Sequence, residues 1–198
     1  EVRIDKIEQT THQYNTNFSN YNFYGIWTFD EGEGGIAYDL SGNAKHGSLY
    51  GDAQWGEGKF DGAIVFDGQS DYVLMPELID GDAYLHNFTA QTWFNFDSDE
   101  IENRYFMGMH SDAKFNFYID QGQLNYQLHL RNKQNGYAYL YTGSYSEELN
   151  EGSWYHVALY YSDEEDVAKV YINGNAFSNF STNPSAESYL GSNHLHIG

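Results

Sequence analysis

The stretch Trp154-Tyr-His-Val-Ala-Leu-Tyr-Tyr161 is followed by an acidic turn, Asp163-Glu-Glu-Asp166, and then by Ala168-Lys-Val-Tyr-Ile172. Apolar and aromatic side chains recur at every second position of the first run, which is the pattern of a β-strand with one buried face. The dipeptide Asn173-Gly174, which favours a tight hairpin turn, comes next. This stretch therefore predicts antiparallel strands joined by short turns.

Similar runs lie on the N-terminal side of this stretch. Residues 88–96, 115–119 and 124–130 are rich in aromatic and apolar side chains, and Asp120-Gln-Gly122 supplies a hairpin turn between the last two runs. About a dozen short strands separated by turns are expected, with no sustained helical period. The spacing predicts an all-β chain folded as a sandwich or jelly roll.

Composition narrows the class of protein further. The 198 residues suit one large all-β domain, and the absence of cysteine excludes a disulfide framework. The net charge of −20 argues against binding to nucleic acid or to an anionic membrane. Aromatic residues make up 18% of the chain, too many for a disordered acidic polymer. No apolar run is long enough to cross a membrane, so membrane insertion is not expected.

The sequence resembles the laminin-G-like, concanavalin-A-like jelly-roll superfamily. The resemblance is carried by three segments: residues 27–34 with 37–47, residues 62–68 with 71–73, and residues 149–158 leading into 170–174. It implies a two-sheet antiparallel jelly-roll β-sandwich at residues 23–198. It also implies an extracellular or cell-surface location.

The two ends of the chain depart from this family. Family members usually finish with a closing strand of the type Asp-Glu-Val-Arg-Ile, which is missing after Leu195, whereas the chain starts with Glu1-Val2-Arg3-Ile4. We therefore expect residues 1–22 to be a strand, carrying Val2 and Ile4, and a polar linker or arm. The strand either belongs to a neighbouring copy in a tandem array or completes this module or another chain by strand addition. A chain boundary unrelated to the fold is the third alternative.

A calcium site is expected near the start of the domain. The resemblance implies a structural Ca²⁺ held by Asp30, Asp39 and Asn43, because the turn from Asp39 to Asn43 offers a carboxylate, an amide oxygen and loop carbonyls. The alternative is a plain turn, in which Asp39 and Asn43 bond their own backbone. Both interpretations stay open at the level of sequence.

Two strand faces are candidates for ligand binding. Tyr137, Tyr139 and Tyr141 alternate on one strand. Gln127 and His129 share a face of another strand. Such side chains can stack on a sugar ring and bond its hydroxyls, provided that the two strands are adjacent. The alternative is packing against the second sheet.

Catalysis is not expected. Glucanases and polysaccharide lyases occur on this fold, but no Glu-x-Asp-x-Glu pattern presents paired carboxylates on one strand face. No sequence motif supplies a nucleophile or carboxylate partner for His156. Two histidines, His194 and His196, are weak evidence for a zinc site. We therefore expect a non-catalytic module for adhesion or recognition of glycans or proteins. The alternatives are a structural repeat of a surface filament, joined to neighbouring copies by strand donation, and a carbohydrate-active enzyme.

Overall fold

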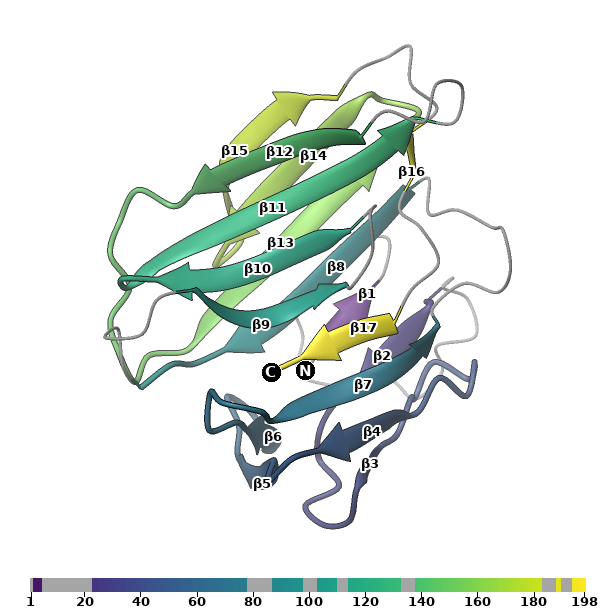
Figure 1. The fold of residues 1–198 in the computed structure, drawn as a ribbon, viewed down its shortest axis with the longest axis vertical. Helices are drawn as coiled ribbons and strands as arrows, with labels where there is room; N and C mark the ends of the chain where they lie inside the picture. The colour runs from purple at the N-terminus through teal and green to yellow at the C-terminus, as the bar shows by residue number, and fades with distance from the viewer. Residues whose placement is uncertain are drawn as a thin grey trace.

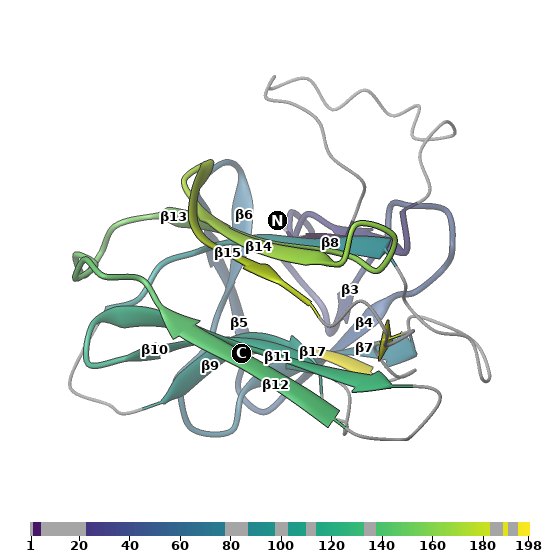
Figure 2. The same ribbon diagram turned by 90° about the horizontal axis from the view of Figure 1, so that it is seen from above.

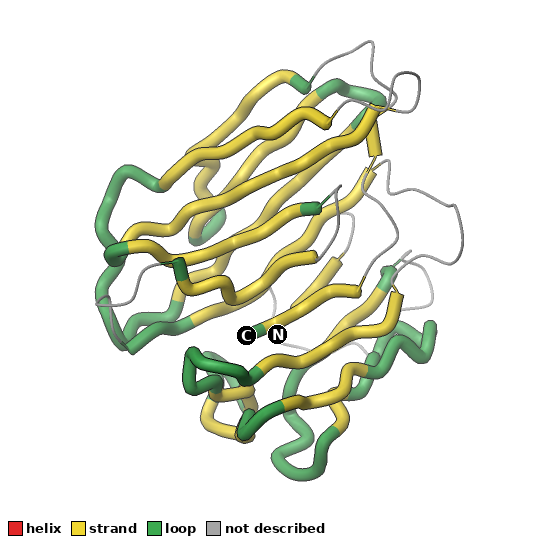
Figure 3. The backbone as a smooth tube through the Cα atoms, viewed as in Figure 1, coloured by secondary structure: helices red, strands yellow, loops and turns green. Residues whose placement is uncertain are grey.

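A computed structural model describes residues 2–4, 23–77, 87–97, 103–109, 114–132, 138–182, 188–189 and 194–198. All regular structure in these residues is β-strand, and the strands pair antiparallel (Figures 1 and 3). No membrane-spanning helix is found in this part of the chain. The all-β fold expected from the sequence is confirmed.

One sheet has six strands. In spatial order they are β15 (Asn175–Ser181), β14 (Val167–Ile172), β13 (Tyr155–Ser162), β8 (Asn87–Phe94), β1 (Val2–Ile4) and β2 (Gly25–Trp27). The hairpin predicted from the fold-deciding stretch is β13–β14, and Asn173-Gly174 turns the chain into β15. Asn173 and Gly174 both have positive φ angles, 47° and 80°, as a tight hairpin turn requires.

The other sheet has nine strands. Eight of them follow the order β12 (Ala138–Ser144), β11 (Gln123–Asn132), β10 (Phe115–Asp120), β9 (Arg104–Met109), β17 (His194–Ile197), β7 (Tyr72–Glu77), β4 (Gly47–Tyr50) and β3 (Ile36–Ala37). The ninth, β16 (Ser188–Tyr189), pairs with β11. A separate hairpin joins β5 (Gln54–Glu57) and β6 (Gly62–Val65). Figure 2 shows the two large sheets stacked face to face.

The core lies between these sheets. Alternate residues of β8, such as Phe88 and Phe94, face alternate residues of β10, such as Phe115, and all are buried. The ring centroids of Phe88 and Phe115 lie 5.9 Å apart across the interface. A partly buried hydrogen bond between the hydroxyl groups of Tyr126 and Ser178, at 2.7 Å, also joins the two sheets. Period-two alternation along each strand thus separates the core face from an outer face.

The N-terminal strand occupies a central position. β1 lies between β2 and β8 and is antiparallel to both, with Val2 opposite Trp27 and Thr92. In this structure the strand lies within the sheet of its own chain, and the alternatives that the sequence left open stay predictions. Residues 5–22 lie outside the described residues, and the boundary expected at residue 22 stays a prediction.

Candidate functional site

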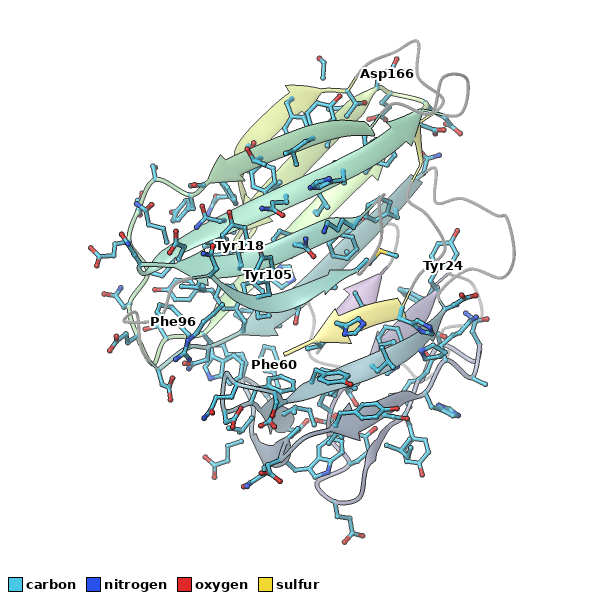
Figure 4. All side chains as sticks on the ribbon, in the orientation of Figure 1. Tyr24, Phe60, Phe96, Tyr105, Tyr118 and Asp166 are labelled. Atoms are coloured by element: carbon cyan, nitrogen blue, oxygen red, sulfur yellow. The ribbon has the colours of Figure 1, made fainter. Side chains whose placement is uncertain are left out.

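The outer face of the nine-stranded sheet carries a row of aromatic and polar side chains across β9 to β12. Tyr118 pairs with Tyr105 on one side and with Asn125 on the other, and Asn125 pairs with Ser144. Tyr118 faces outward because its neighbours Phe117 and Ile119 are buried in the core. The rings of Tyr105 and Tyr118 stack, with centroids 4.9 Å apart, on the side of the sheet that faces the viewer in Figure 4.

An irregularity in β9 places Tyr105 in this row. Phe117 pairs with Met107, whereas Tyr118 pairs with Tyr105, so Phe106 is an additional residue in β9. Phe106 packs inward, where its ring stacks on Phe94 of the other sheet at 4.2 Å. Because the bulge inserts one residue, the next side chain is turned to the opposite face. Tyr105, 45% exposed, therefore points outward.

A second row of amides runs beside the tyrosines. The side chain of Asn116 lies over Gly108, where a Cβ atom would come within 2.1 Å of Asn116 Oδ1. Asn116 Nδ2 donates to Gln127 Oε1 at 3.5 Å. Gln127 also shares a hydrogen bond with Tyr118. Glycine at position 108 thus leaves room for a network of amides that holds the Tyr118 side chain.

A polar hollow of about 390 Å³ opens at the end of the tyrosine row. Its walls are the β10–β11 turn and the loop after β12. Backbone bonds from Leu149 to Gly122 (2.9 Å) and from Tyr145 to Leu124 (2.8 Å) hold the loop against the turn. The hollow is lined by Asp120, Gln121, Gln123, Asn125, Ser144 and Glu148. The lining offers carboxylate, amide and hydroxyl groups, which suit a ligand rich in hydroxyls.

Titration of two residues on this face is altered by their surroundings. Burial raises the pKa of Tyr118, and the nearby Tyr105 and Asp120 raise it further, against the lowering effect of the Gln127 hydrogen bond. Burial lowers the pKa of His129, and the charge of Lys114 lowers it further. At neutral pH both side chains are therefore uncharged and able to donate a hydrogen bond.

A second hollow, of about 380 Å³, is lined by residues of the β5–β6 hairpin, β8 and β9. Its lining mixes polar and charged residues with aromatic ones, which include Phe60, Trp93, Phe96 and Trp154. Tyr105 also lines it, so the stacked tyrosines stand between this hollow and the polar one. In Figure 4, Tyr105 lies between Tyr118 and Phe60. Tyr105 thus lines the second hollow, whereas Asn125, the strand partner of Tyr118, lines the polar one.

The sequence comparison identifies the family. Residues 67–198 match the Laminin_G_3 family model, described as the concanavalin A-like lectin/glucanases superfamily. The chain belongs to this family. The resemblance noted in the sequence is thereby confirmed, and the two-sheet antiparallel sandwich agrees with it. No curated protein sequence matches the Laminin_G_3 chain.

Solved structures share the fold at low sequence identity. Domain 4 of AbnA, an extracellular arabinanase from Geobacillus stearothermophilus solved with arabinotriose, has a TM-score of 0.57 at 18% identity, over 88% of this chain and 82% of that one. The receptor binding domain of botulinum neurotoxin D has a TM-score of 0.63 at 16% identity, over 88% and 44%. The binding domain of botulinum neurotoxin DC with rat synaptotagmin II has a TM-score of 0.57 at 14% identity, over 88% and 43%. The Laminin_G_3 chain spans less than half of the neurotoxin domains.

The ligand-binding residues predicted from the sequence are divided between two faces of this Laminin_G_3 domain. Gln127 lies on the outer face, as does His129 two residues further along the same strand. Their strand is adjacent to that of Tyr141, but Tyr141 pairs with the buried Leu128 and stacks on Phe180 of the other sheet at 4.9 Å. Tyr141 therefore does not share the face of Gln127, because residues directly opposite in a sheet project to the same side.

Two other predicted tyrosines are not placed. Tyr137 lies outside the described residues, and of Tyr139 only the backbone is described. The sequence analysis missed Tyr105, Tyr118 and Asn125. Alternation with the apolar Phe117 and Ile119 indicates that Tyr118 faces outward. Its neighbours Tyr105 and Asn125 are set by strand register, which no local sequence pattern shows.

Asp39 holds the backbone of its own loop. Its Oδ1 atom accepts hydrogen bonds from the N–H groups of Ile26 (2.9 Å) and Ser41 (2.8 Å). Its Oδ2 atom accepts from Ser41 Oγ (2.8 Å) and the N–H group of Lys45 (3.0 Å). A carboxylate has about four acceptor positions, so the chain itself fills those of Asp39.

The three predicted calcium ligands, Asp30, Asp39 and Asn43, form hydrogen bonds with different segments before, within and after β2. Asn43 Nδ2 donates to the carbonyl of Phe23, before β2, at 2.6 Å. Asp30 follows β2, and its Oδ1 atom accepts from the N–H group of Gly62 at 2.8 Å. No group of three or more His, Cys, Asp or Glu side chains able to hold a metal occurs among the described residues. These three residues do not fit a shared cation as they stand, and calcium binding stays a prediction.

The histidines singled out in the sequence have structural contacts. His156 Nε2 bonds Gln91 Oε1 at 3.0 Å, and its ring lies 5.3 Å from Trp93. His194 Nδ1 bonds the carbonyl of Met75 at 3.0 Å, whereas the His196 ring stacks on Tyr72 at 5.5 Å. These contacts account for the three side chains through packing and hydrogen bonding.

Proposed function

We propose that this Laminin_G_3 domain is a non-catalytic, extracellular recognition module that binds oligosaccharides on the outer face of its nine-stranded sheet. The observation that carries the proposal is the row from Tyr105 and Tyr118 through Asn125 to Ser144, which leads into the polar hollow. Tyrosine rings stack on the apolar face of a sugar, and amide and hydroxyl groups bond its hydroxyls.

The dimensions of the row support a ligand of several sugar units. Neighbouring strands lie about 4.8 Å apart, so the row across β9 to β12 extends over about 14 Å. The hollow of about 390 Å³ is within the usual size range of small-ligand sites. A chain of sugars lying across the strands would contact the tyrosine pair and the hollow together.

The solved relatives supply starting probes. The AbnA domain was solved with arabinotriose and belongs to an extracellular enzyme, and the neurotoxin DC domain was solved with the protein rat synaptotagmin II. At these identities the likeness supports the fold, so the ligand class rests on the tyrosine row. We favour a glycan over a protein receptor because the row ends in a hollow lined by polar groups.

The test is a glycan array that includes arabino-oligosaccharides, followed by calorimetry on the glycans that bind. Tyr105→Ala is expected to weaken binding about tenfold, the value of one lost stacking contact. Tyr50→Ala is the matched control, because Tyr50 is 43% exposed on the same face and stacks on Tyr72 with the same centroid distance of 4.9 Å. Absence of glycan binding, or equal losses in the two variants, would contradict the proposal.

Enzymatic activity is an alternative function, because the hollow contains two carboxylates. Glycosidases act through a pair of carboxyl groups that flank the scissile bond, and Asp120 and Glu148 line the same hollow. We expect no new reducing ends when the protein is incubated with each bound glycan. Product release that Asp120→Asn abolishes would make the module an enzyme.

Assembly with neighbouring copies through β1 is the second candidate function. The observation that favours it is that residues 5–24 join β1 to β2, although adjacent antiparallel strands need only about two to five linking residues. A connection of this length lets β1 reach a second copy. It also gives intrachain pairing an effective concentration in the millimolar range, so the monomer is expected at micromolar protein.

Cysteines at positions 3 and 91 separate the two arrangements, because Arg3 and Gln91 are directly opposite in β1 and β8. An oxidised monomer on a non-reducing gel would indicate pairing within one chain. Oxidised dimers and longer ladders at micromolar concentration would establish strand donation between copies.

A further inference from the structure

The polar hollow is acidic. Asp120 and Glu148 are among its lining residues, and none of those residues is a lysine, arginine or histidine. The loop that forms its wall also carries Glu147 and Glu151, both exposed. Backbone bonds to the β10–β11 turn fix this loop, so its charges stay beside the hollow.

Lys114, a cation described on this face, is remote from the hollow. Lys114 precedes β10 and acts on His129, whereas Asp120 ends β10. Six residues of extended strand place the two about 20 Å apart, well beyond the screening length of about 8 Å at physiological salt. Lys114 therefore does not neutralise the carboxylates of the hollow. The net charge of −20 adds a field of the same sign around the whole molecule.

A carboxylate accepts hydrogen bonds and donates none. Sugar hydroxyls can supply the donors that Asp120 and Glu148 need, and such charge-assisted bonds are stronger than neutral ones. A sulfate or uronate group offers only acceptors and brings like charge, which costs free energy without a compensating bond. We propose that the site selects neutral oligosaccharides and rejects their sulfated, uronate or sialylated counterparts. This selectivity rests on the proposed glycan-binding function.

Calorimetry on matched pairs tests the selectivity, using a neutral oligosaccharide that binds and the same oligosaccharide carrying a sulfate or uronate. We expect the anionic member to bind at least about tenfold more weakly at low salt, and the gap to narrow in high salt as screening increases. The affinity of the neutral member should change little with salt. Equal or tighter binding of the anionic member would overturn the selectivity and leave glycan binding intact.

Charge variants show whether the hollow itself discriminates. D120N/E148Q should reduce the gap between the two members of a pair. E164Q/E165Q removes the same charge from the turn between β13 and β14, whose Asp166 lies far from Tyr118 in Figure 4, and should leave the gap unchanged. Equal effects of the two variants would mean that net charge alone rejects anions. If neither member of any pair binds, the glycan-binding function fails together with its selectivity.

Discussion

The rings of Tyr105 and Tyr118 stack on the outer face because one additional residue, Phe106, interrupts the alternation of β9. Regular alternation from the buried Met107 would turn Tyr105 toward the core. The inserted ring is itself part of the core, where it stacks on Phe94. A single bulge thus supplies both a core contact and half of the proposed sugar platform.

Deletion of Phe106 should keep the platform and destabilise the core. Tyr105 would then be the direct neighbour of the buried Met107 in a regular strand, which leaves Tyr105 opposite Tyr118 on the outer face. The lost packing of a large aromatic side chain should cost about 3 kcal/mol of unfolding free energy. Denaturant unfolding measures the stability, and calorimetry measures glycan affinity at a temperature where the variant is folded. Phe106→Leu, which keeps the bulge, is the control and should lose less stability. Loss of glycan affinity in the folded deletion variant would show that outward placement of Tyr105 opposite Tyr118 is not sufficient for binding.

Removal of the Asp39 carboxylate should destabilise the start of the domain. Asp39→Ala leaves the N–H groups of Ile26, Ser41 and Lys45 without this acceptor, and the first of these bonds is buried. We expect a loss of about 3 kcal/mol in chemical denaturation, because bonds to a charged acceptor are among the stronger ones. Asp39→Asn keeps one carbonyl oxygen and should lose less. A cost equal to that of Ser41→Ala would contradict the role of Asp39 as the organiser of this loop.

Calcium binding at the same loop has its own signature. A cation that binds the folded state alone raises stability in proportion to the logarithm of its concentration. The sequence prediction of calcium therefore expects a higher melting temperature in millimolar CaCl₂ than in EDTA, and no such shift in Asp39→Asn. Equal melting temperatures of the unmodified protein in the two solutions would show that hydrogen bonds, without calcium, stabilise the loop.

A shorter connection should stabilise the chain if β1 pairs within its own module. Replacing residues 7–22 with Asn-Gly turns β1 and β2 into a hairpin with a short loop, since Ile4 already pairs with Gly25. Loop-closure entropy then predicts a gain of about 1 kcal/mol. The variant should remain a monomer in light scattering. A variant that does not fold, or that folds only when a separate β1 peptide is added, would indicate that β1 normally pairs with another copy of the chain.

His129 should make stability depend on pH near neutrality. Burial and Lys114 lower its pKa in the folded state below the usual value of 6.5, so the unfolded chain binds more protons as the pH falls. The contribution of His129 is present above about pH 6.5 and is lost as the pH falls toward the folded-state pKa. His129→Gln should reduce the change in melting temperature between pH 7.5 and about 5.5. Most carboxyl groups titrate below this range. If the melting temperatures of the variant and the unmodified protein change equally with pH, His129 is not the cause of the pH dependence.

Local patterns in the sequence determined the elements of this fold. Alternation in the run from Trp154 to Tyr161 predicted a strand with one buried face, and the structure has β13 there. Asn173-Gly174 and Gln121-Gly122 predicted hairpin turns, and all four residues have positive φ angles. These features depend only on neighbouring residues, because side-chain alternation and turn geometry are properties of a short segment.

Tertiary structure alone decided which residues meet. The bulge at Phe106 brings Tyr105 to Tyr118, register sets Asn125 beside them, and the pairing of Tyr141 with Leu128 turns that tyrosine to the core. Likewise, Val2 finds its place between β2 and β8 only when both strands are present. Strand register and bulges depend on partners that are distant in the chain, so a one-residue shift that the local pattern does not record moves a side chain from one face to the other.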